Sequence, residues 1–419
     1  MTKSDDKRVP TLRFKGFTDE WEQRKLGCLM NITSVKRIHQ SDWRKKGIPF
    51  YRARDITALS KNLNIEEPIF ISRDLYEEYS KISGKVQIND LLVTGVGTIG
   101  VPLLVQTVPL YFKDGNIIWF QNSNKLIGLF FLYLFKTNTV QKYIHTTTGV
   151  GTVPTYTIQS GKNTPVYITS KKEQKDIGTI FQLIDNLISL QQRKLKLLKL
   201  LKKAMLQTLF TNKSIPNLRF ISFDKSWDIV KLKDVGKATG GTSIESEFTS
   251  IEGTHKVISI GSYKENHTYN DQGIRVNLND KTKKRVLNKD DLTMILNDKT
   301  TSGRIIGSVL LIPVDNVFVY NQRTERIEPN HKKFSSKFLY QYLNSPNIRN
   351  KIVSNAQGNT QIYVNWSSIS KIKYLMPQKK EQDKISKLLF ILDFIINNQQ
   401  LRIKKYERFK QFLLQNMFI

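Results

Sequence analysis

Basic side chains gather in two stretches of the chain, with aromatic and amide side chains among them. The first stretch contains Lys36, Arg37, Arg44, Lys45, Lys46, Arg52 and Arg54, with Trp43 and Tyr51 between them. The second contains Lys281, Lys283, Lys284, Arg285, Lys299, Arg304 and Arg323, with Asn321 and Gln322 nearby. Arg and Lys neutralise phosphates and read guanine edges, whereas Asn and Gln read adenine. We therefore predict DNA contacts here, although any single one of these side chains is more often a solvated surface charge.

Two polar, glycine-containing loops follow these stretches, Gly149-Val150-Gly151-Thr152 and Gly358-Asn359-Thr360-Gln361. Such loops can lie against phosphates through backbone N–H groups and small side chains. Thr152, Thr360 and Gln361 are therefore added to the predicted DNA contacts. The alternative is that both loops are plain connecting turns.

The patterns expected of a catalytic or cofactor site are missing. Gly95-Val96-Gly97-Thr98-Ile99-Gly100 matches the dinucleotide-binding spacing, but a strand-like run follows instead of a helix, so we interpret it as a β-turn. The chain has no P-loop, no methyltransferase Asn/Asp-Pro-Pro-aromatic tetrapeptide, and no histidine spacing typical of metal ligands. We expect no catalytic residue, no metal and no cofactor in this chain, while scattered nuclease carboxylates remain open.

The composition favours a polyanionic partner. Lys and Arg number 66 against 36 Asp and Glu, a formal charge of +30 over 419 residues. The alternative is a protein that is merely basic, or one that binds an acidic protein. Hydrophobic residues make up 39%, enough for folded cores. The single cysteine, Cys28, excludes a disulfide within the chain and fits a reducing cytoplasm, and no apolar run is long enough to span a membrane.

The elements that must position these residues occur twice. The motif Val9-Pro10-Thr11-Leu12-Arg13-Phe14 returns as Ile215-Pro216-Asn217-Leu218-Arg219-Phe220, 206 residues later, and Trp21 returns as Trp227. Two long amphipathic runs, 172–210 and 380–418, each begin with Lys-Glu-Gln. The first has the seam Ile177, Phe181, Ile184, Ile188, Gln191, Leu195, Leu198, Lys202, Met205 and Leu209. The second has Ile385, Leu389, Leu392, Ile396, Gln399, Ile403, Tyr406, Lys410, Leu413 and Met417, always 208 residues further on. Spacings that alternate four and three predict coiled-coil helices.

The seams predict how the helices pair. Each run would form a helix of roughly 55–60 Å. Antiparallel pairing would bring Gln191 and Gln399 together, and one buried polar pair can fix the register. The alternative is two core helices of an ordinary α-rich domain.

We predict an α+β fold in which two β-rich mixed domains are separated by two long antiparallel helices, as a tandem pseudo-twofold repeat. The expected boundaries are 1–20 for the lead and opening motif, 21–165 for the first domain, 166–213 for the central helix, 214–371 for the second domain and 372–419 for the C-terminal helix.

The β-rich segments between the opening motif and the long helix have diverged between the two copies; we call these segments the middles. Asp90 matches Asp291 at an offset of 201, whereas Gly100 matches Gly307 at 207. Short β-like runs dominate both middles, and we expect one helix at 124–146 in the first. In the second, we expect a helix at 335–344 that Ser345-Pro346 interrupts before a further helical run. A retained frame with diverged middles is what two recognition surfaces for two different targets would look like.

In combination, these features resemble the specificity (S) subunits of type I restriction-modification enzymes. They are the tandem halves, the opening motif with Trp21 and Trp227, the Gly47-Ile48-Pro49-Phe50 segment before Arg54-Asp55-Ile56, the Gly-Asn-Thr-Gln loop, and Pro377 before the Glu381-Gln382 helix start. The first copy departs from the pattern, because Tyr167-Ile168-Thr169-Ser170 precedes its helix without a proline.

The resemblance implies a non-catalytic bacterial cytoplasmic subunit that binds double-stranded DNA. Its two target recognition domains would read the halves of a bipartite, asymmetric sequence with a fixed spacer. It implies two modification subunits that methylate adenine N6 with S-adenosylmethionine, and two restriction subunits that use ATP and Mg²⁺. A second apolar stripe, Ile180, Leu187, Leu197 and Leu201, would dock the modification subunits. The alternatives are a non-specific nucleic-acid-binding structural protein with a coiled-coil spacer, and a fused type II enzyme half.

Overall fold

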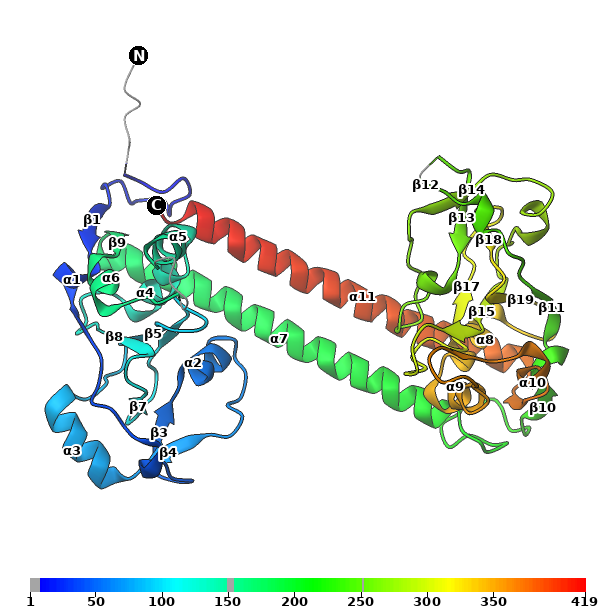
Figure 1. The fold of residues 1–419 in the computed structure, drawn as a ribbon, viewed down its shortest axis with the longest axis horizontal. Coiled ribbons are helices and arrows are strands. Elements are labelled where there is room, and N and C mark those ends of the chain that lie inside the picture. The colour runs from blue at the N-terminus through cyan, green and yellow to red at the C-terminus, as the bar shows by residue number, and fades with distance from the viewer. Residues whose placement is uncertain (1–7, 149–153, 251) are drawn as a thin grey trace, which may run out of the picture. The chain divides into compact units, whose positions relative to one another are not determined.

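The computed structural model describes residues 8–148, 154–250 and 252–419. The chain forms two compact units, Met1–Gln192 with Leu401–Ile419, and Arg193–Gln400. Two long helices, α7 (Lys171–Leu209) and α11 (Lys379–Asn416), each contribute one half to each unit (Figure 1). Each unit thus combines one β-rich domain with half of both helices. The domain boundaries given above, which cut the chain at the helix ends, stay a prediction.

In the first unit, the strands of two main sheets lie between the opening motif and α7 along the chain. Its elements are β1 (Glu22–Lys25), α1 (Leu26–Leu29), β2 (Asn31–Thr33), η1 (Gln40–Asp42), β3 (Ile48–Tyr51), α2 (Ala53–Ser60), β4 (Ile69–Ile71), α3 (Arg73–Ser83), β5 (Leu91–Thr94), β6 (Pro102–Leu104), β7 (Tyr111–Phe112), β8 (Ile117–Gln121), α4 (Gly128–Phe135), α5 (Asn138–Thr147), α6 (Ile158–Asn163) and β9 (Pro165–Ile168). The sheet orders are β2-β8-β5-β6 and β4-β3-β7, and β1 pairs with β9. Strands β3 and β7 run parallel.

The second unit repeats this plan. Its elements are β10 (Asp228–Lys231), η2 (Leu232–Asp234), β11 (Gly236–Gly240), η3 (Glu245–Glu247), β12 (Thr249–Ser250), β13 (His255–Ile258), η4 (Ile260–Ser262), β14 (Ile274–Val276), η5 (Lys283–Arg285), β15 (Leu292–Ile295), β16 (Asn297–Asp298), β17 (Val309–Leu311), β18 (Phe318–Tyr320), β19 (Thr324–Pro329), α8 (Ser336–Leu343), α9 (Pro346–Val353), β20 (Ile362–Tyr363), α10 (Trp366–Ile369) and β21 (Lys373–Met376). The sheet orders are β11-β19-β15-β17 and β12-β14-β13-β18, with β10 paired to β21. Strands β13 and β18 run parallel, as β3 and β7 do.

The repeated topology confirms the tandem α+β architecture, and the differences are local. In the first unit, helix α2 follows β3 and helix α3 follows β4. At the same places in the second unit stand the short 3₁₀ turns η4 and η5. We call β2-β8-β5-β6 and its counterpart β11-β19-β15-β17 the larger sheet, and β4-β3-β7 and its counterpart β12-β14-β13-β18, whose strands are shorter, the smaller sheet. The connections around the smaller sheet have changed, and it has the additional edge strand β12 in the second unit, while the shared strands have kept their order.

The single helix expected at 124–146 is wrong, because α4 and α5 are separate helices. Thr137 divides them: its hydroxyl donates to Leu134 O at 2.7 Å and accepts from Val140 N at 3.4 Å, as an N-cap does. In the second copy, the break at Ser345-Pro346 between α8 and α9 is confirmed.

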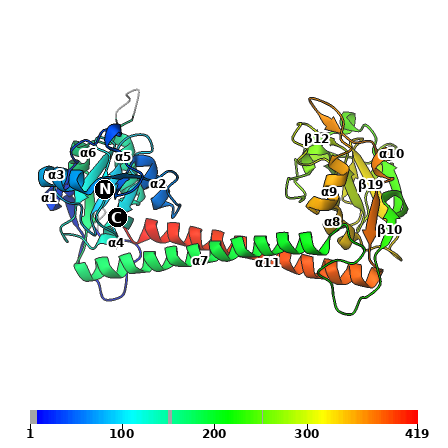
Figure 2. The same cartoon turned by 90° about the horizontal axis from the view of Figure 1, so that it is seen from below.

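Within each unit, the two helices lie side by side and antiparallel (Figure 2). In the first unit, the Phe181 and Phe418 ring centroids are 5.8 Å apart, and Asp185 forms an ion pair with Lys410. Moving forward along α7 therefore means moving backward along α11. The seam residues Ile177, Phe181 and Ile184 are buried in one cluster with Leu413 and Met417, which confirms the predicted apolar seam there.

The lysines that interrupt the seams have carboxylate partners on the opposite helix. Lys410 pairs with Asp185 in the first unit, and Lys202 pairs with Asp393 in the second. Each carboxylate also accepts a hydrogen bond from its own domain, from Tyr133 Oη at 2.8 Å and from Gln341 Nε2 at 2.7 Å. Gln191 belongs to the first unit and Gln399 to the second, so their pairing stays a prediction.

A buried glutamate at the start of each helix ties it to the opening motif. Arg13 donates to the two carboxylate oxygens of Glu173 at 2.6 and 2.8 Å, and Arg219 donates to those of Glu381 at 2.8 Å each. The next residue, Gln174 or Gln382, accepts from a backbone N–H of the β-rich domain, Ile127 N at 3.0 Å or Ser335 N at 2.8 Å. The Glu-Gln pair shared by the two helix starts is therefore the fastening of the helix, through Glu to the opening motif and through Gln to the β-rich domain.

Removing the arginine of this fastening should destabilise the fold, because it leaves a buried carboxylate without its partner. We expect Arg219→Met to lower the free energy of unfolding by about 3–5 kcal/mol, measured by denaturant unfolding of the full chain. Arg219→Met with Glu381→Gln should recover most of the loss. The matched control is Arg24→Met, whose pair with Glu22 is exposed, at 50% and 58% for the two side chains, and which should cost under about 1 kcal/mol. Equal losses for Arg219→Met and Arg24→Met would contradict this role.

Candidate nucleic-acid interface

In the second unit, a long loop and a hairpin bring four of the predicted DNA contacts together. The loop, residues 296–306, follows β15 and carries Lys299 and Arg304; the hairpin carries Thr360 and Gln361 before β20. Short strands join them, with Asn297 opposite Tyr363 and Asp298 opposite Ile362. All four predicted side chains are exposed. This arrangement gives the second unit a polar, cationic edge.

A buried carboxylate in the loop and a glycine turn in the hairpin give the two segments a fixed shape. The carboxylate of Asp298 accepts from Thr300 N at 2.9 Å and from Ile305 N at 3.1 Å, which closes the loop on itself. In the hairpin, Gly358 has φ +104°, and a Cβ there would lie 2.2 Å from Gln361 O. Only glycine fits that turn, so the polar tip is structured by its backbone.

The remaining predicted DNA contacts of the second unit differ in burial and in their partners. The Arg285 guanidinium donates through Nε and Nη2 to Thr242 Oγ1, at 3.0 and 2.7 Å, and lies over the Tyr320 ring. Asn321 is buried, and its amide donates to Glu245 Oε1 at 3.2 Å, so it lies below the surface. The other five residues of the set are on or near the surface: Lys281, Lys283, Lys284 and Gln322 are exposed, while Arg323 is half-buried. The carbonyl of Arg323 accepts from Leu296 N at 3.0 Å, which places this turn beside the loop.

In the first unit, the predicted contacts fall into two groups. Trp43, Arg44, Lys45 and Arg52 line one depression with Glu67. Arg54 pairs with Glu67 at its edge, and Lys46 is exposed nearby in sequence. The second group is Lys36, whose ammonium lies 4.1 Å from the Tyr79 ring centroid, and Arg37, which pairs with Asp114 at 2.8 Å. Thr152 and its loop lie outside the described residues.

Burial separates the ion pairs that DNA could open from those that it could not. Arg37, Arg54 and Arg304 are 57–68% exposed. Arg54 and Arg304 pair with the exposed Glu67 and Glu265, whereas Arg37 pairs with the half-buried Asp114. Arg54 also lies 3.8 Å from the buried Asp55 carboxylate. Exposed pairs of this kind contribute only about 0–1 kcal/mol, so a phosphate can replace the carboxylate. Arg52 is different, because both of its pairing nitrogens lie 2.8 and 3.0 Å from the buried Asp55 carboxylate. Its guanidinium fixes the start of α2.

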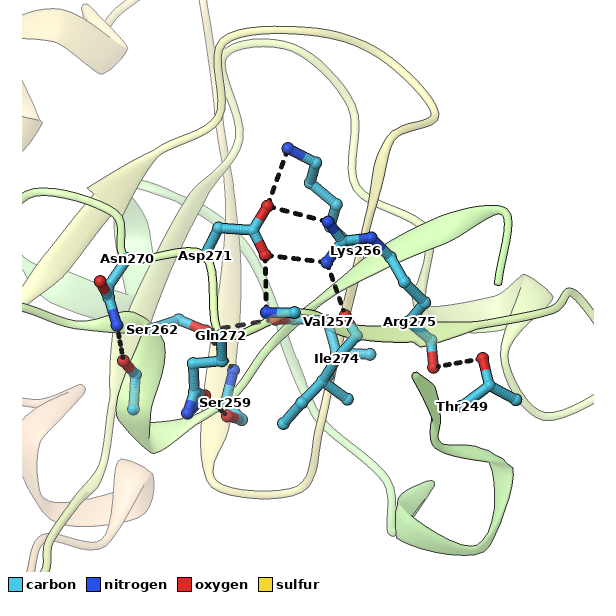
Figure 3. A network of polar contacts seen from close by, with 12 residues as sticks. Thr249, Lys256, Val257, Ser259, Ser262, Asn270, Asp271, Gln272, Ile274 and Arg275 are labelled. Atoms are coloured by element: carbon cyan, nitrogen blue, oxygen red, sulfur yellow. Dashed lines mark hydrogen bonds and ion pairs between the residues drawn. The ribbon is translucent and has the colours of Figure 1, made fainter. Parts of the chain in front are cut away.

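A charged network that the sequence did not suggest lies on the smaller sheet of the second unit (Figure 3). The Asp271 carboxylate accepts from Arg275 at 2.8 and 3.0 Å and pairs with Lys256 at 3.0 Å. Hydrogen bonds from Arg275 first, then from Gly273 N, hold the pKa of Asp271 well below its usual range. The network joins β13 and β14 to the connection between them, and no local sequence pattern predicted it.

The residues considered for other chemistry occupy ordinary structural positions. Gly95–Gly100 connects β5 to β6, which confirms the interpretation as a turn between strands. Cys28 is an exposed free thiol. Among the residues that the structure describes, no group of three or more His, Cys, Asp or Glu side chains is placed to hold a metal ion.

The family model for the type I restriction modification DNA specificity domain matches this chain twice, over residues 18–200 and 224–405. The chain belongs to this family. It therefore carries two DNA specificity domains in tandem, as the specificity subunit of a type I restriction-modification system.

Individual relatives agree with the family match. The type I restriction enzyme MjaVIII specificity subunit of Methanocaldococcus jannaschii is 22% identical over 354 residues, 82% of each chain. A putative type I specificity subunit of Haemophilus influenzae is 31% identical over 26% of this chain and 27% of its own. The crystal structure of the S subunit from M. genitalium matches with a TM-score of 0.58 at 15% identity, over 98% of this chain and 99% of the other. In the described part of the chain, no helix has the length and apolarity that a membrane span requires.

One buried carboxyl of this specificity subunit is poised to titrate near neutral pH. Glu325 lies on β19, opposite Met294, and is only 6% exposed. Burial raises the pKa of Glu325 to about 7, against the opposing charge of Arg285. The predicted contact Arg285 therefore has a carboxyl neighbour that local sequence did not reveal.

The raised pKa of Glu325 predicts a pH dependence of stability. The unfolded carboxyl ionises near pH 4.3, so between there and about pH 7 only the folded chain keeps the proton. The free energy of unfolding therefore falls as the pH rises through this window and levels off above it. Glu325→Gln removes this dependence. The melting temperature of Glu325→Gln minus that of the wild type should therefore increase as the pH is raised from about 5 to about 8. The exposed Glu252→Gln is the control for calorimetry. A melting-temperature difference between Glu325→Gln and wild type that does not change with pH would contradict the raised pKa of Glu325.

Proposed function

We propose that each unit reads one half of a bipartite, asymmetric DNA target with a fixed spacer. One observation carries this proposal: the two units share strand order and helix fastening, but differ in the segments that bear their exposed cations. Two units with the same reading face would be expected to read the same half-site twice. A non-specific nucleic-acid-binding structural protein would need no such divergence.

The chemistry belongs, in this proposal, to the partner subunits. Two modification subunits would bind S-adenosylmethionine and methylate adenine N6, and two restriction subunits would use ATP and Mg²⁺. The chain itself would be non-catalytic and would position double-stranded DNA. Support comes from the formal charge of +30 and from the exposed cations of each unit, because phosphate neutralisation supplies much of DNA affinity.

A genome-wide methylation map tests this assignment. The chain would be co-expressed with a type I modification subunit in a host without DNA methylation, and N6-methyladenine would be mapped. We expect a two-part motif with a constant spacer. Exchanging residues 21–164 for the corresponding domain of another specificity subunit should change one half only, because the other unit keeps its own sheets. A stable complex whose methylation follows no two-part motif would overturn the proposal.

Each unit also presents an equivalent apolar surface for a modification subunit. Leu201 and Phe409, which are 208 residues apart in sequence, are both 50% exposed, and the equivalent Leu187 and Ile395 are half-buried and 41% exposed. The first unit has Leu187 and Phe409; the second has Ile395 and Leu201. Two matching surfaces suit two copies of one partner. Of the other predicted docking residues, Leu197 is 58% exposed, whereas Ile180 packs against the core of the first unit.

Charge substitutions on these surfaces should weaken assembly. Leu187→Glu and Leu201→Glu each place a carboxylate where we propose that the partner buries apolar area, and the affinity should fall by roughly tenfold or more. Size-exclusion chromatography with light scattering would report how many modification subunits bind. Lys194→Glu, on an exposed position of the same helix, is the matched control. Full binding of two partner copies by both leucine variants would refute the docking surface.

A further inference from the structure

The loop that follows the central strand of the larger sheet is six residues longer in the second unit than in the first. In the first unit, Gly100 N donates to Thr94 O and closes the loop around residues 95–99. In the second, Gly307 N donates to Ile295 O and encloses residues 296–306. The closing glycines have φ of +75° and +71°, so the frame of the loop is the same in both copies. The extra residues include Lys299 and Arg304.

The longer loop lines a concave surface of mixed polar and apolar character. Lys299, Thr300, Ser302 and Arg304 of the loop line it together with Tyr263, Glu265 and the apolar Ile260 and Ile305. The exposed pair between Arg304 and Glu265, at 3.0 Å, crosses it. Cations and hydroxyl groups on a concave surface suit the phosphates and base edges of a DNA strand.

One side chain from outside the loop binds the backbone carbonyls of the loop. Arg349, on α9, donates through Nη2 to Gly303 O at 2.7 Å and to Arg304 O at 2.5 Å, and through Nε to Ile306 O at 3.1 Å. It is half-buried, and its planar guanidinium carries five N–H donors, so it can bind several carbonyls at once. Three carbonyls over four residues are thereby fixed to a rigid helix.

The first copy has a smaller group in the same role. Gln141, 208 residues before Arg349, lies on α5 and donates through Nε2 to Gly100 O at 2.9 Å and to Phe135 O at 2.7 Å. An amide suffices for the short loop, whereas the long loop is held by a guanidinium. The difference at this position therefore follows the difference in loop length.

We propose that Arg349 is a positioning residue for the half-site read by the second unit. It fixes residues 296–306 so that Lys299 and Arg304 meet DNA in one geometry. This inference rests on the proposed function, and it assigns the loop to one half of the target. Its loss should affect discrimination in that half more than the assembly of the complex.

The test uses the complete methyltransferase, assembled from this chain and a modification subunit. Methylation rates would be measured on the wild-type motif and on duplexes with single base changes in each half. We expect Arg349→Gln, which introduces the amide of the first copy, to reduce discrimination in one half by roughly tenfold, as expected when hydrogen bonds to a charged group are lost. Arg349→Lys should recover part of it. Lys332→Gln, an exposed position, is the control for the lost charge.

A second variant keeps the test valid if Arg349→Gln destabilises the chain. Residues 296–306 would be replaced by the five-residue loop of the first copy, Gly-Val-Gly-Thr-Ile, which closes between equivalent strands. We expect methylation to lose its preference in the same half and to keep it in the other. Unchanged discrimination in the loop variant, or an equal loss in both halves with either variant, would overturn the inference. A wild-type complex that shows no two-part motif would instead mean that the proposed function itself fails.

Discussion

A buried carboxylate at the start of each long helix constrains how the rest of the chain is arranged. Glu173 and Glu381 are inaccessible to solvent, and each has one arginine that donates to both of its oxygens. An isolated buried charge is costly, so the opening motif that supplies Arg13 or Arg219 must lie at the helix start. The neighbouring glutamine then fixes the domain to the same turn. Helix, motif and β-rich domain form one block because the glutamate binds the motif and the glutamine next to it binds the domain.

That block leaves the reading segments free to differ. The arginine–glutamate contacts and the lysine–aspartate pairs between the helices recur at offsets of 206 to 208 residues, and the strand order recurs although its offsets vary. In contrast, α2 and α3 are replaced by short turns in the second unit, and its loop after β15 is longer by six residues. Changes in the segments that connect the strands leave the hydrogen bonds between the buried strands unchanged. A specificity subunit can therefore change the segments that bear its exposed cations without changing how it folds.

The arginines of the chain fall into two groups, those that hold the fold together and those that are exposed, and burial distinguishes the groups. Arg13, Arg219, Arg52 and Arg349 are held by carboxylates or carbonyls inside the units, where losing a partner is costly. Arg37, Arg54 and Arg304 are exposed and pair only weakly, so they can exchange a carboxylate for a phosphate. A net charge of +30 does not distinguish these groups. The contacts of each guanidinium do.

The sequence by itself determined the tandem repeat, the helix seams and the family, because periodicity and repetition are properties of residue order. It located most strands, but it missed the break at Thr137, since a threonine cap inside an apolar run resembles helix interior. It also missed Arg349, Glu325 and the Asp271 network. Arg349 acts on carbonyls more than 40 residues away, as with the 2.7 Å bond to Gly303 O, and the pKa of Glu325 depends on burial. The Asp271 network joins Lys256, Asp271 and Arg275, which only the pairing of β13 with β14 brings together. Only the tertiary structure decided which cations are exposed, because a side chain's solvent contact and partners are set by packing between distant segments.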